Sequence, residues 1–292
     1  MKRSKLIKTP NAILTGDWHL RENTPSCFTG DFEEEQWNSV AFVSDLQKKY
    51  NCPVICTGDL FHHWKPSPWL LSRCIELIPK KFYTIFGQHD LPQHNLQLEH
   101  KSGINTLRQA GVVHVLRGCH FGQTPKESSS TLYNMLVWHH LTYLSKSFPG
   151  ATGGNAISIL KKYPQFDLIV TGDNHISFTV EYKGRRLVNT GNLTRQSAAQ
   201  IDFKPCVWLW YAEDNSVKQV FLPIQEGVIS REHIDHKEER DARLEAFVSR
   251  LDEDWKTAMG YEDNLEEFFN TNETDKRIEQ IIYNSLETET NI

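Results

Sequence analysis

Five short apolar runs, each ending in aspartate or histidine side chains, restrict the fold of this 292-residue chain more than any other feature. An apolar run of about four to eight residues is typical of a buried strand. Polar side chains just past a strand lie at a sheet edge, where binding sites are common. The segments are Ala12-Ile-Leu-Thr-Gly-Asp-Trp-His19, Thr57-Gly-Asp-Leu-Phe-His62, Phe86-Gly-Gln-His-Asp90, Leu136-Val-Trp-His-His140 and Thr171-Gly-Asp-Asn-His175.

Segments with helical periodicity lie between several of the expected strands. This alternation indicates an α/β layer architecture with largely buried strands. The pattern predicts strands at 12–15, 54–57, 82–86, 112–116, 133–138 and 168–171. It predicts helices at 33–50, 68–78, 104–110 and 156–162.

Two hairpins are expected after His175, at 177–189 and 206–223, because strand-like runs there flank turn residues. We expect them to form a second sheet packed on the first, giving a sandwich flanked by helices. From Ile229 onward the chain becomes charged and helical, with three apolar stripes. The predicted division is therefore a domain at 1–228 and an acidic helical segment at 229–292.

Composition excludes several classes of protein. Apolar residues make up 39% of the chain, but no run approaches the roughly 18 residues of a membrane span. The basic start is not followed by the apolar stretch of a signal peptide, so we expect a cytoplasmic protein without a membrane partner. The six cysteines include no Cys-x-x-Cys pair, which argues against a zinc knuckle or a disulfide framework.

The net charge of −5 is unevenly distributed. Residues 231–292 hold 18 acidic and 8 basic side chains, which leaves the preceding residues with a net charge of about +5. The body of the protein can therefore bind a polyanion despite the overall negative charge.

The strand-end side chains are suited to two divalent cations, which need a bridging carboxylate and further oxygen or nitrogen ligands. Asp17 and His19 alternate along an extended segment, so both can point to one side. Asp59 follows Gly58, where the backbone can turn sharply, and is the candidate bridge. A single Asp-x-His is weak evidence, whereas five such clusters favour a two-metal phosphoesterase.

In order and spacing, these segments resemble the five motifs of the calcineurin-like metallophosphoesterases, over residues 12 to about 195. The run Gly58-Asp-Leu-Phe-His62, continued by Lys65-Pro-Ser-Pro68, resembles the DNA-repair nuclease branch, the SbcD type and its phage relatives. The later Thr190-Gly-Asn-Leu-Thr-Arg195 matches that branch only loosely.

The resemblance implies a role for each site residue. It assigns the first metal to Asp17, His19, Asp59 and His175, and the second to Asp59, Gln88, His139 and Asp173. It places His89 opposite the scissile phosphate as a catalytic residue, His62 near the nucleic acid, and Arg195 on a substrate phosphate. His139 is preferred to His140 because it comes first after the strand, but the sequence leaves both open.

Two residues depart from the family pattern, and both belong to the second metal. Most members have asparagine where this chain has Gln88, and histidine where it has Asp173. Oxygen ligands favour Mn²⁺ or Mg²⁺ over zinc, so Mn²⁺ is the expected metal and Mg²⁺ the second choice. The alternative interpretation is a weakened second site.

The leading hypothesis is a DNA exonuclease or endonuclease that works with an SMC-like ATPase subunit of the SbcC type. The chain has no Gly-x-x-x-x-Gly-Lys-Ser/Thr loop, so ATP would be used by another chain. The helical tail would either dock that partner or pack on its own domain, and residues 68–78 are a candidate homodimer contact. The alternatives are a phosphatase acting on nucleotide or protein monoesters, and a metal-depleted scaffold.

Overall fold

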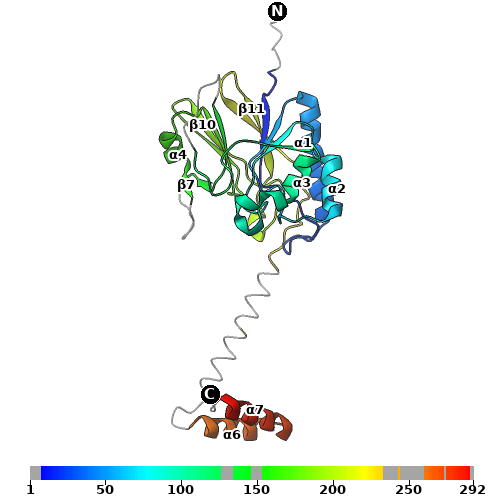
Figure 1. The fold of residues 1–292 in the computed structure, drawn as a ribbon, viewed down its shortest axis with the longest axis vertical. Helices are drawn as coiled ribbons and strands as arrows, with labels where there is room; N and C mark the ends of the chain where they lie inside the picture. Colours follow the sequence, from blue (N-terminus) through cyan, green and yellow to red (C-terminus); the bar gives the residue numbers. More distant parts are fainter. Residues whose placement is uncertain are drawn as a thin grey trace, which may run out of the picture. The chain divides into compact units, whose positions relative to one another are not determined.

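The computed structural model describes residues 8–125, 134–145, 153–232, 243, 260–272 and 274–289, and it divides into two units (Figure 1). The units are Met1–Arg231 and Glu232–Ile292. Ile229 forms a bridge with Phe28, and the Ser230 amide donates to the Cys27 carbonyl over 2.7 Å. The boundary predicted after residue 228 is therefore slightly early, because these pairings belong to the first unit.

A six-stranded sheet has the order β12-β11-β1-β2-β3-β4. Its strands are β1 (Ala12–Thr15), β2 (Val54–Cys56), β3 (Phe82–Thr84), β4 (Val113–Val115), β11 (Cys206–Tyr211) and β12 (Ser216–Phe221). The neighbours from β1 to β4 run parallel, and β11 pairs antiparallel with β1. The carboxyl ends of β1, β2 and β3 therefore share one edge.

A four-stranded sheet has the order β5-β8-β10-β9. Its strands are β5 (Met135–His139), β8 (Leu168–Gly172), β9 (Phe178–Tyr182) and β10 (Arg185–Asn189); a small separate pair joins β6 (Thr142–Tyr143) and β7 (Gly154–Asn155). Strands β5 and β8 are parallel, so the residues that follow them also emerge at one edge.

The two hairpins do not form one sheet, contrary to the expectation from the sequence. The β9–β10 hairpin completes the four-stranded sheet, whereas the β11–β12 hairpin extends the six-stranded sheet beside β1. Strand β11 is buried from Cys206 to Trp210 and pairs antiparallel with β1 on one edge and with β12 on the other.

The sheets pack face to face as a sandwich. Ala12 and Leu14 of β1 and Trp208 of β11 contact Leu168 and Val170 of β8 in one apolar cluster. The intervening residue of β1, Ile13, faces the opposite way and packs with the helices, as the period of a strand requires. The predicted α/β sandwich is confirmed.

Helices cover the outer faces of the sandwich (Figure 1). The helices are α1 (Phe32–Tyr50), α2 (Pro68–Leu77) and α3 (Gly103–Gln109) beside the six-stranded sheet, and α4 (Ala156–Lys162) on the four-stranded sheet; the short turns are η1 (Pro92–His94) and η2 (Leu96–Lys101). Asp31 caps α1 and Ser67 caps α2, each by accepting a backbone N–H. Val40 and Val43 of α1 are fully buried.

The second unit contains α6 (Tyr261–Thr271) and α7 (Lys276–Glu289). The rings of Phe269 and Tyr283 lie 5.7 Å apart, edge to face, so the two helices contact each other. The stripe expected at Leu244, Phe247, Val248, Leu251 and Trp255 lies outside the described residues. In the part of the chain that the structure describes, every helix is too short or too polar to cross a membrane.

Candidate metal centre

The five strand-end segments meet where the carboxyl ends of β1, β2 and β3 approach those of β5 and β8. The Asp17 amide donates to the Gly58 carbonyl over 3.1 Å, and the His19 amide donates to the Asp59 carbonyl over 2.9 Å. The Asp173 amide donates to both carboxylate oxygens of Asp17, each at 3.1 Å. The first two bonds join the ends of β1 and β2 within one sheet, and the bonds from Asp173 join the two sheets, at the edge where α/β proteins commonly bind ligands.

Asp17, His19 and His175 form one group whose ligand atoms all lie within 4.8 Å of one another. The Nε2 atoms of His19 and His175 are 3.3 Å apart. Burial lowers the pKa of His175 to about 4 and holds the pKa of His19 well below its usual range. Both imidazoles are therefore neutral near pH 7, which is the form that binds a metal ion.

Asp17, Asp59 and His139 form a second such group, and all three are buried. Asp59 accepts the His89 amide at Oδ1 over 2.8 Å, whereas its Oδ2 atom has no hydrogen-bond partner. The Nδ1–H of His139 donates to the Thr57 carbonyl over 2.8 Å. That bond leaves Nε2 of His139 facing Asp59 Oδ2 at 3.5 Å.

The charges of this second group are strongly linked. Burial raises the pKa of Asp17 well above its usual range, and Asp59 adds to the rise. Burial also disfavours ionised Asp59, but His139, His19 and His89 together hold its pKa below the usual range. Burial disfavours charged His139, yet Asp59, Asp17 and Asp173 raise its pKa to about 10. The carboxylates thus favour positive charge within the group.

The donor set fits divalent cations. Asp59 Oδ2, His139 Nε2 and His19 Nδ1 are buried polar atoms with no hydrogen-bond partner. Leaving such atoms unpaired costs free energy, so they are expected to meet a ligand. A mixture of carboxylate oxygens and imidazole nitrogens is suited to Mn²⁺, Mg²⁺ or zinc.

Gln88 and Asp173, the two departures from the family pattern, lie against each other. The Gln88 amide Nε2 donates to Asp173 Oδ1 over 3.1 Å. Burial raises the pKa of Asp173. The second group in the structure therefore draws on Asp17 in addition to Asp59 and His139, while Gln88 and Asp173 form an adjoining pair.

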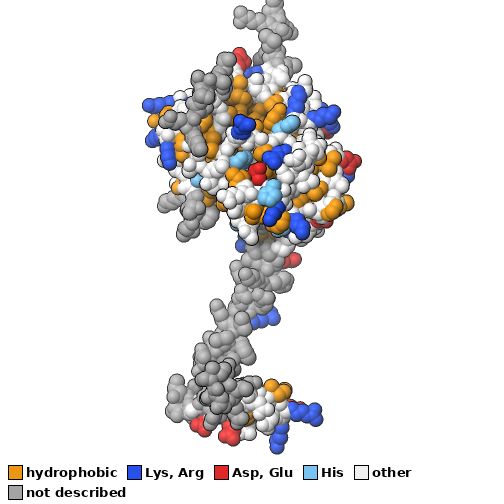
Figure 2. Space-filling model, viewed as in Figure 1, with side chains coloured by type: hydrophobic (Ala, Val, Ile, Leu, Met, Phe, Trp, Pro, Cys, Tyr) orange, Lys and Arg blue, Asp and Glu red, His pale blue; other side chains and the backbone are white. Residues whose placement is uncertain are grey.

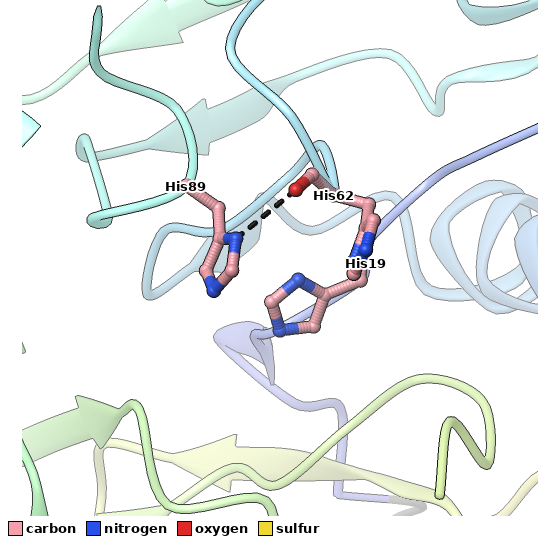
Figure 3. A group of neighbouring side chains, drawn as sticks. All are labelled: His19, His62 and His89. Carbon is pink, nitrogen blue, oxygen red and sulfur yellow. Dashed lines mark hydrogen bonds between the residues drawn. The ribbon is translucent and has the colours of Figure 1, made fainter. Parts of the chain in front are cut away.

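His89 and His62 lie beside the carboxylates. The Nδ1–H of His89 donates to the His62 carbonyl over 3.0 Å, and the two rings stack with centroids 5.6 Å apart (Figure 3). His19 lies edge-on to His89 at 4.9 Å. Burial lowers the pKa of His62 to about 4. On the face drawn in Figure 2, histidine and acidic side chains gather near the middle of the larger unit, with lysine and arginine side chains around them.

The structure separates the two histidines that the sequence left open. His139 is buried in the second group, whereas His140 stacks on Trp138 with ring centroids 4.0 Å apart. Trp138 belongs to the cluster between the four-stranded sheet and α4, so His140 faces away from the carboxylates. His139 is the one of the two that can act as a ligand here.

Several of the candidate ligands have left-handed backbone conformations, which are costly for most residues and common at functional sites. The φ angles of Asp17, His19, Asp59 and Asp173 are 47°, 45°, 50° and 75°. Gly58 has a φ of 99°, and a Cβ there would lie 2.7 Å from the Gly87 amide nitrogen. The turns after β1, β2 and β8 therefore aim these side chains at the cost of local strain.

Two further residues support the site, and the sequence did not assign them. Asp90 accepts the amides of Gly87 and Phe61 over 3.0 and 3.1 Å, so it ties the loop after β3 to the loop after β2. Its place in Gly-Gln-His-Asp90 was a usable signal. The backbone N–H of Asn192 donates to the His175 carbonyl, and neither polar atom of its buried side chain has a hydrogen-bond partner. Its place in the segment Thr190-Gly-Asn-Leu-Thr-Arg195 was the available signal.

Arg195 corrects one expectation. Its side chain is only 3% exposed, and its guanidinium pairs with Glu35 of α1 at 3.3 Å and donates to the Gln225 carbonyl. A substrate phosphate would have to displace a buried ion pair to reach it. The structure therefore gives Arg195 a role in joining the loop after β10 to α1, in place of the expected phosphate contact.

Comparison with known proteins identifies the family of the chain. The family model described as calcineurin-like phosphoesterase matches residues 11–177. Among curated proteins, none matches the chain. Three similar solved structures are an archaeal phosphodiesterase, a protein from Thermus thermophilus and a metallophosphoesterase from Sphaerobacter thermophilus.

The similarity to these structures is remote. Sequence identities are 11%, 8% and 11%, and TM-scores are 0.42, 0.44 and 0.37. The alignments cover 72%, 74% and 73% of this chain, and 99%, 100% and 88% of the other chains.

We predict that Asp59→Asn weakens the binding of both metal ions, because Asp59 Oδ2 faces Nε2 of His19 at 3.8 Å and Nε2 of His139 at 3.5 Å. Metal analysis after dialysis against excess Mn²⁺ should find about two ions in the wild-type chain and fewer than one in the variant. The exposed Asp45→Asn is the matched control and should keep the wild-type count. An Asp59→Asn protein with unchanged metal content would contradict the assignment of Asp59.

We predict that Arg195→Met lowers the free energy of unfolding by about 3–5 kcal/mol, because it leaves the Glu35 carboxylate buried without its partner. Urea denaturation measures this change. Lys48→Met removes the exposed pair with Asp45 and should cost at most about 1 kcal/mol. Equal losses in the two variants would contradict a structural role for Arg195.

Proposed function

The chain belongs to the calcineurin-like phosphoesterase family, and from that membership we propose that it is a metal-dependent DNA nuclease that hydrolyses phosphodiester bonds. The observation that carries this proposal is the stacked His62–His89 pair beside the buried carboxylates. His62 ends the Gly58–His62 segment, which is the part of the sequence that most resembles the DNA-repair nucleases.

The metals would be held by the side chains already described. Asp17, His19 and His175 would hold the first cation, His139 with Gln88 and Asp173 the second, and Asp59 would contact both. When bound, two such cations would polarise the phosphate and lower the pKa of an attacking water. Mn²⁺ is the proposed metal, because Gln88 and Asp173 would contribute oxygen ligands.

His89 is positioned to act on the substrate itself. Its amide is held by Asp59 and its Nδ1–H by the His62 carbonyl, so the orientation of the ring is fixed. The remaining Nε2 atom can carry a second proton and deliver it to the leaving oxygen of the phosphodiester. His62 stacks on that ring and, with its pKa lowered to about 4 by burial, stays neutral near pH 7.

DNA as the substrate is supported by charge. The residues up to 230 carry a net charge of about +5, so the first unit favours a polyanion. The second unit holds the acidic excess, which would repel the same polymer. A phosphatase acting on monoesters would gain little from this asymmetry, because its substrate carries few charges.

We predict that the protein cleaves an end-labelled DNA duplex or a plasmid in the presence of Mn²⁺, and that His89→Ala lowers kcat by about 10²–10⁴-fold. The variant should keep the wild-type metal content, since the ring of His89 is not proposed as a ligand. Gel-based cleavage assays and metal analysis measure the two quantities.

His114→Ala is the matched control, because His114 stacks on Tyr83 of β3 and lies outside the candidate ligand groups. Its cleavage rate should match the wild type. Hydrolysis of p-nitrophenyl phosphate with no cleavage of any DNA would contradict the nuclease proposal. An equal loss of metal in His89→Ala and Asp59→Asn would contradict the separate roles of these residues.

We also propose that the protein works with an SMC-like ATPase subunit of the SbcC type, docked on the second unit. Ile278 of α7 is 51% exposed, and the apolar side of this helix is suited to a partner surface. The proposed homodimer would use α2, which carries the exposed side chains Trp69 and Ile75.

We predict that Ile278→Glu weakens binding to the purified ATPase subunit by at least about tenfold, because a charge would be buried in an apolar contact. Isothermal titration calorimetry measures the affinity. Gln280→Glu adds a charge at an exposed position of the same helix and should bind like the wild type. Equal affinities for all three proteins would argue against docking through α7.

A further inference from the structure

Arg21 lies in the loop after β1, beside the loop that carries His62. Leu20 forms a bridge with Phe61, and the Leu20 carbonyl accepts the His62 amide over 3.1 Å. Arg21 is the next residue along the chain. After burial, repulsion by Arg21 is the largest cause of the lowered pKa of His62, ahead of the neighbouring His89. The positive charge of Arg21 therefore reaches the side of the metal centre formed by these two histidines.

Neutral side chains hold Arg21 at both its backbone and its guanidinium. The Gln36 carboxamide of α1 accepts the Arg21 amide over 3.0 Å and donates to the Arg21 carbonyl over 3.1 Å. The guanidinium Nε donates to Asn23 Oδ1 over 3.0 Å, and Nη1 donates to Gln196 Oε1 over 3.3 Å. Both partners of the guanidinium are amide oxygens, so they orient the group without neutralising its charge.

The guanidinium of Arg21 keeps donors for a ligand. It has five N–H groups, and its two hydrogen bonds leave free donors on Nη1 and Nη2. Among the described residues no carboxylate pairs with it, whereas Arg73 and Arg195 each have a glutamate partner. Nη2 has no hydrogen-bond partner and is not among the buried atoms, so solvent reaches it. A phosphate, with several oxygens, is the anion that such a fork of N–H groups suits best.

We propose that Arg21 binds the phosphate next to the scissile one on the same DNA strand, through the free N–H groups of Nη1 and Nη2. Its guanidinium makes no hydrogen bond to a candidate metal ligand, so the phosphate it binds is a neighbour of the one at the metals. Arg21 thus supplies the phosphate contact that the buried Arg195 does not. The inference deepens the proposed nuclease function and rests on it, because a monoester substrate has no neighbouring phosphate.

The test measures the binding of a short fluorescein-labelled DNA duplex to the full chain in Mn²⁺ by fluorescence anisotropy, with His89→Ala as the background so that cleavage is slow. Arg21→Gln should raise Kd about tenfold, because a charge-assisted hydrogen bond is lost. The slope of log Kd against log salt concentration should fall by about one, as for one lost phosphate contact. An unchanged Kd and slope would overturn the proposal.

Lys48→Gln is the matched control, because it removes one positive charge at an exposed position of α1. Its Kd and salt slope should equal those of the background protein. A loss as large as that of Arg21→Gln would show that net charge alone determines binding, and it would overturn the specific contact.

Two further variants separate binding from a structural role of Arg21. Arg21→Lys keeps the charge and should lose less affinity than Arg21→Gln, with the salt slope preserved. Gln196→Glu keeps the shape of the side chain but places a carboxylate against Nη1, so it should weaken DNA binding while Arg21 stays in place. Normal DNA binding by Gln196→Glu, or equal losses in the Lys and Gln variants, would overturn the proposal. Gln196→Glu answers the question if Arg21→Gln folds poorly.

These results are separable from the outcome of the DNA cleavage assay. Cleavage of DNA by a protein whose DNA binding does not depend on Arg21 would leave the nuclease proposal standing and remove the phosphate contact. A protein that binds DNA through Arg21 but cuts none would keep the contact and contradict the nuclease proposal.

Discussion

The buried carboxylate of Asp59 is the constraint on which the rest of the site depends. One oxygen accepts the His89 amide, and the other has no hydrogen-bond partner while it faces His19 and His139. Such an atom is costly in a protein interior unless a positive charge offsets it. Of the two imidazoles that face it, His139, whose pKa is raised to about 10, supplies part of that charge, and divalent cations would supply the remainder.

The local backbone keeps Asp59 in this position. Gly58 takes a conformation that a side chain would strain, and Gly87 approaches so closely that a Cβ would lie 2.1 Å from Asp59 Oδ1. The carboxylate of Asp90 then joins the two loops, because it accepts the backbone amides of Phe61 and Gly87. The turn after β2 therefore depends on the turn after β3.

Two of the three candidate ligand groups need both sheets, whereas the group of His19, His62 and His89 comes from the six-stranded sheet alone. The six-stranded sheet leads to Asp17, His19 and Asp59, and the four-stranded sheet leads to His139 and His175. Each of the two groups that contain Asp17 combines residues from both sheets. Packing of the sandwich through the cluster of Leu14, Leu168 and Trp208 is consequently a condition for forming the metal centre.

Local patterns predicted the elements and several of the site positions. The apolar runs located β1 and β8, and α4 was predicted with its observed bounds, because the apolar periods and turn residues are local signals. The choice between His139 and His140 needed the three-dimensional structure. Neighbouring residues of a strand face opposite ways, and the sequence does not say which face meets the carboxylates.

Long-range contacts account for what the sequence could not supply. A hairpin pattern does not specify which sheet the hairpin joins, so the place of β11 beside β1 was missed. The resemblance placed Arg195 at a phosphate, and its ion-pair partner Glu35, which is far away in the chain, could not be inferred from that local pattern. Gln196, which orients the guanidinium of Arg21, is likewise distant from it in the chain.

A crystal structure of the chain with Mn²⁺, examined by anomalous diffraction at the manganese edge, tests the central claim most directly. We expect two anomalous peaks, one contacting Asp17, His19 and His175, the other contacting His139, with the Asp59 carboxylate touching both. A single peak that does not touch Asp59, or none at saturating Mn²⁺, would contradict a two-metal centre built around that carboxylate.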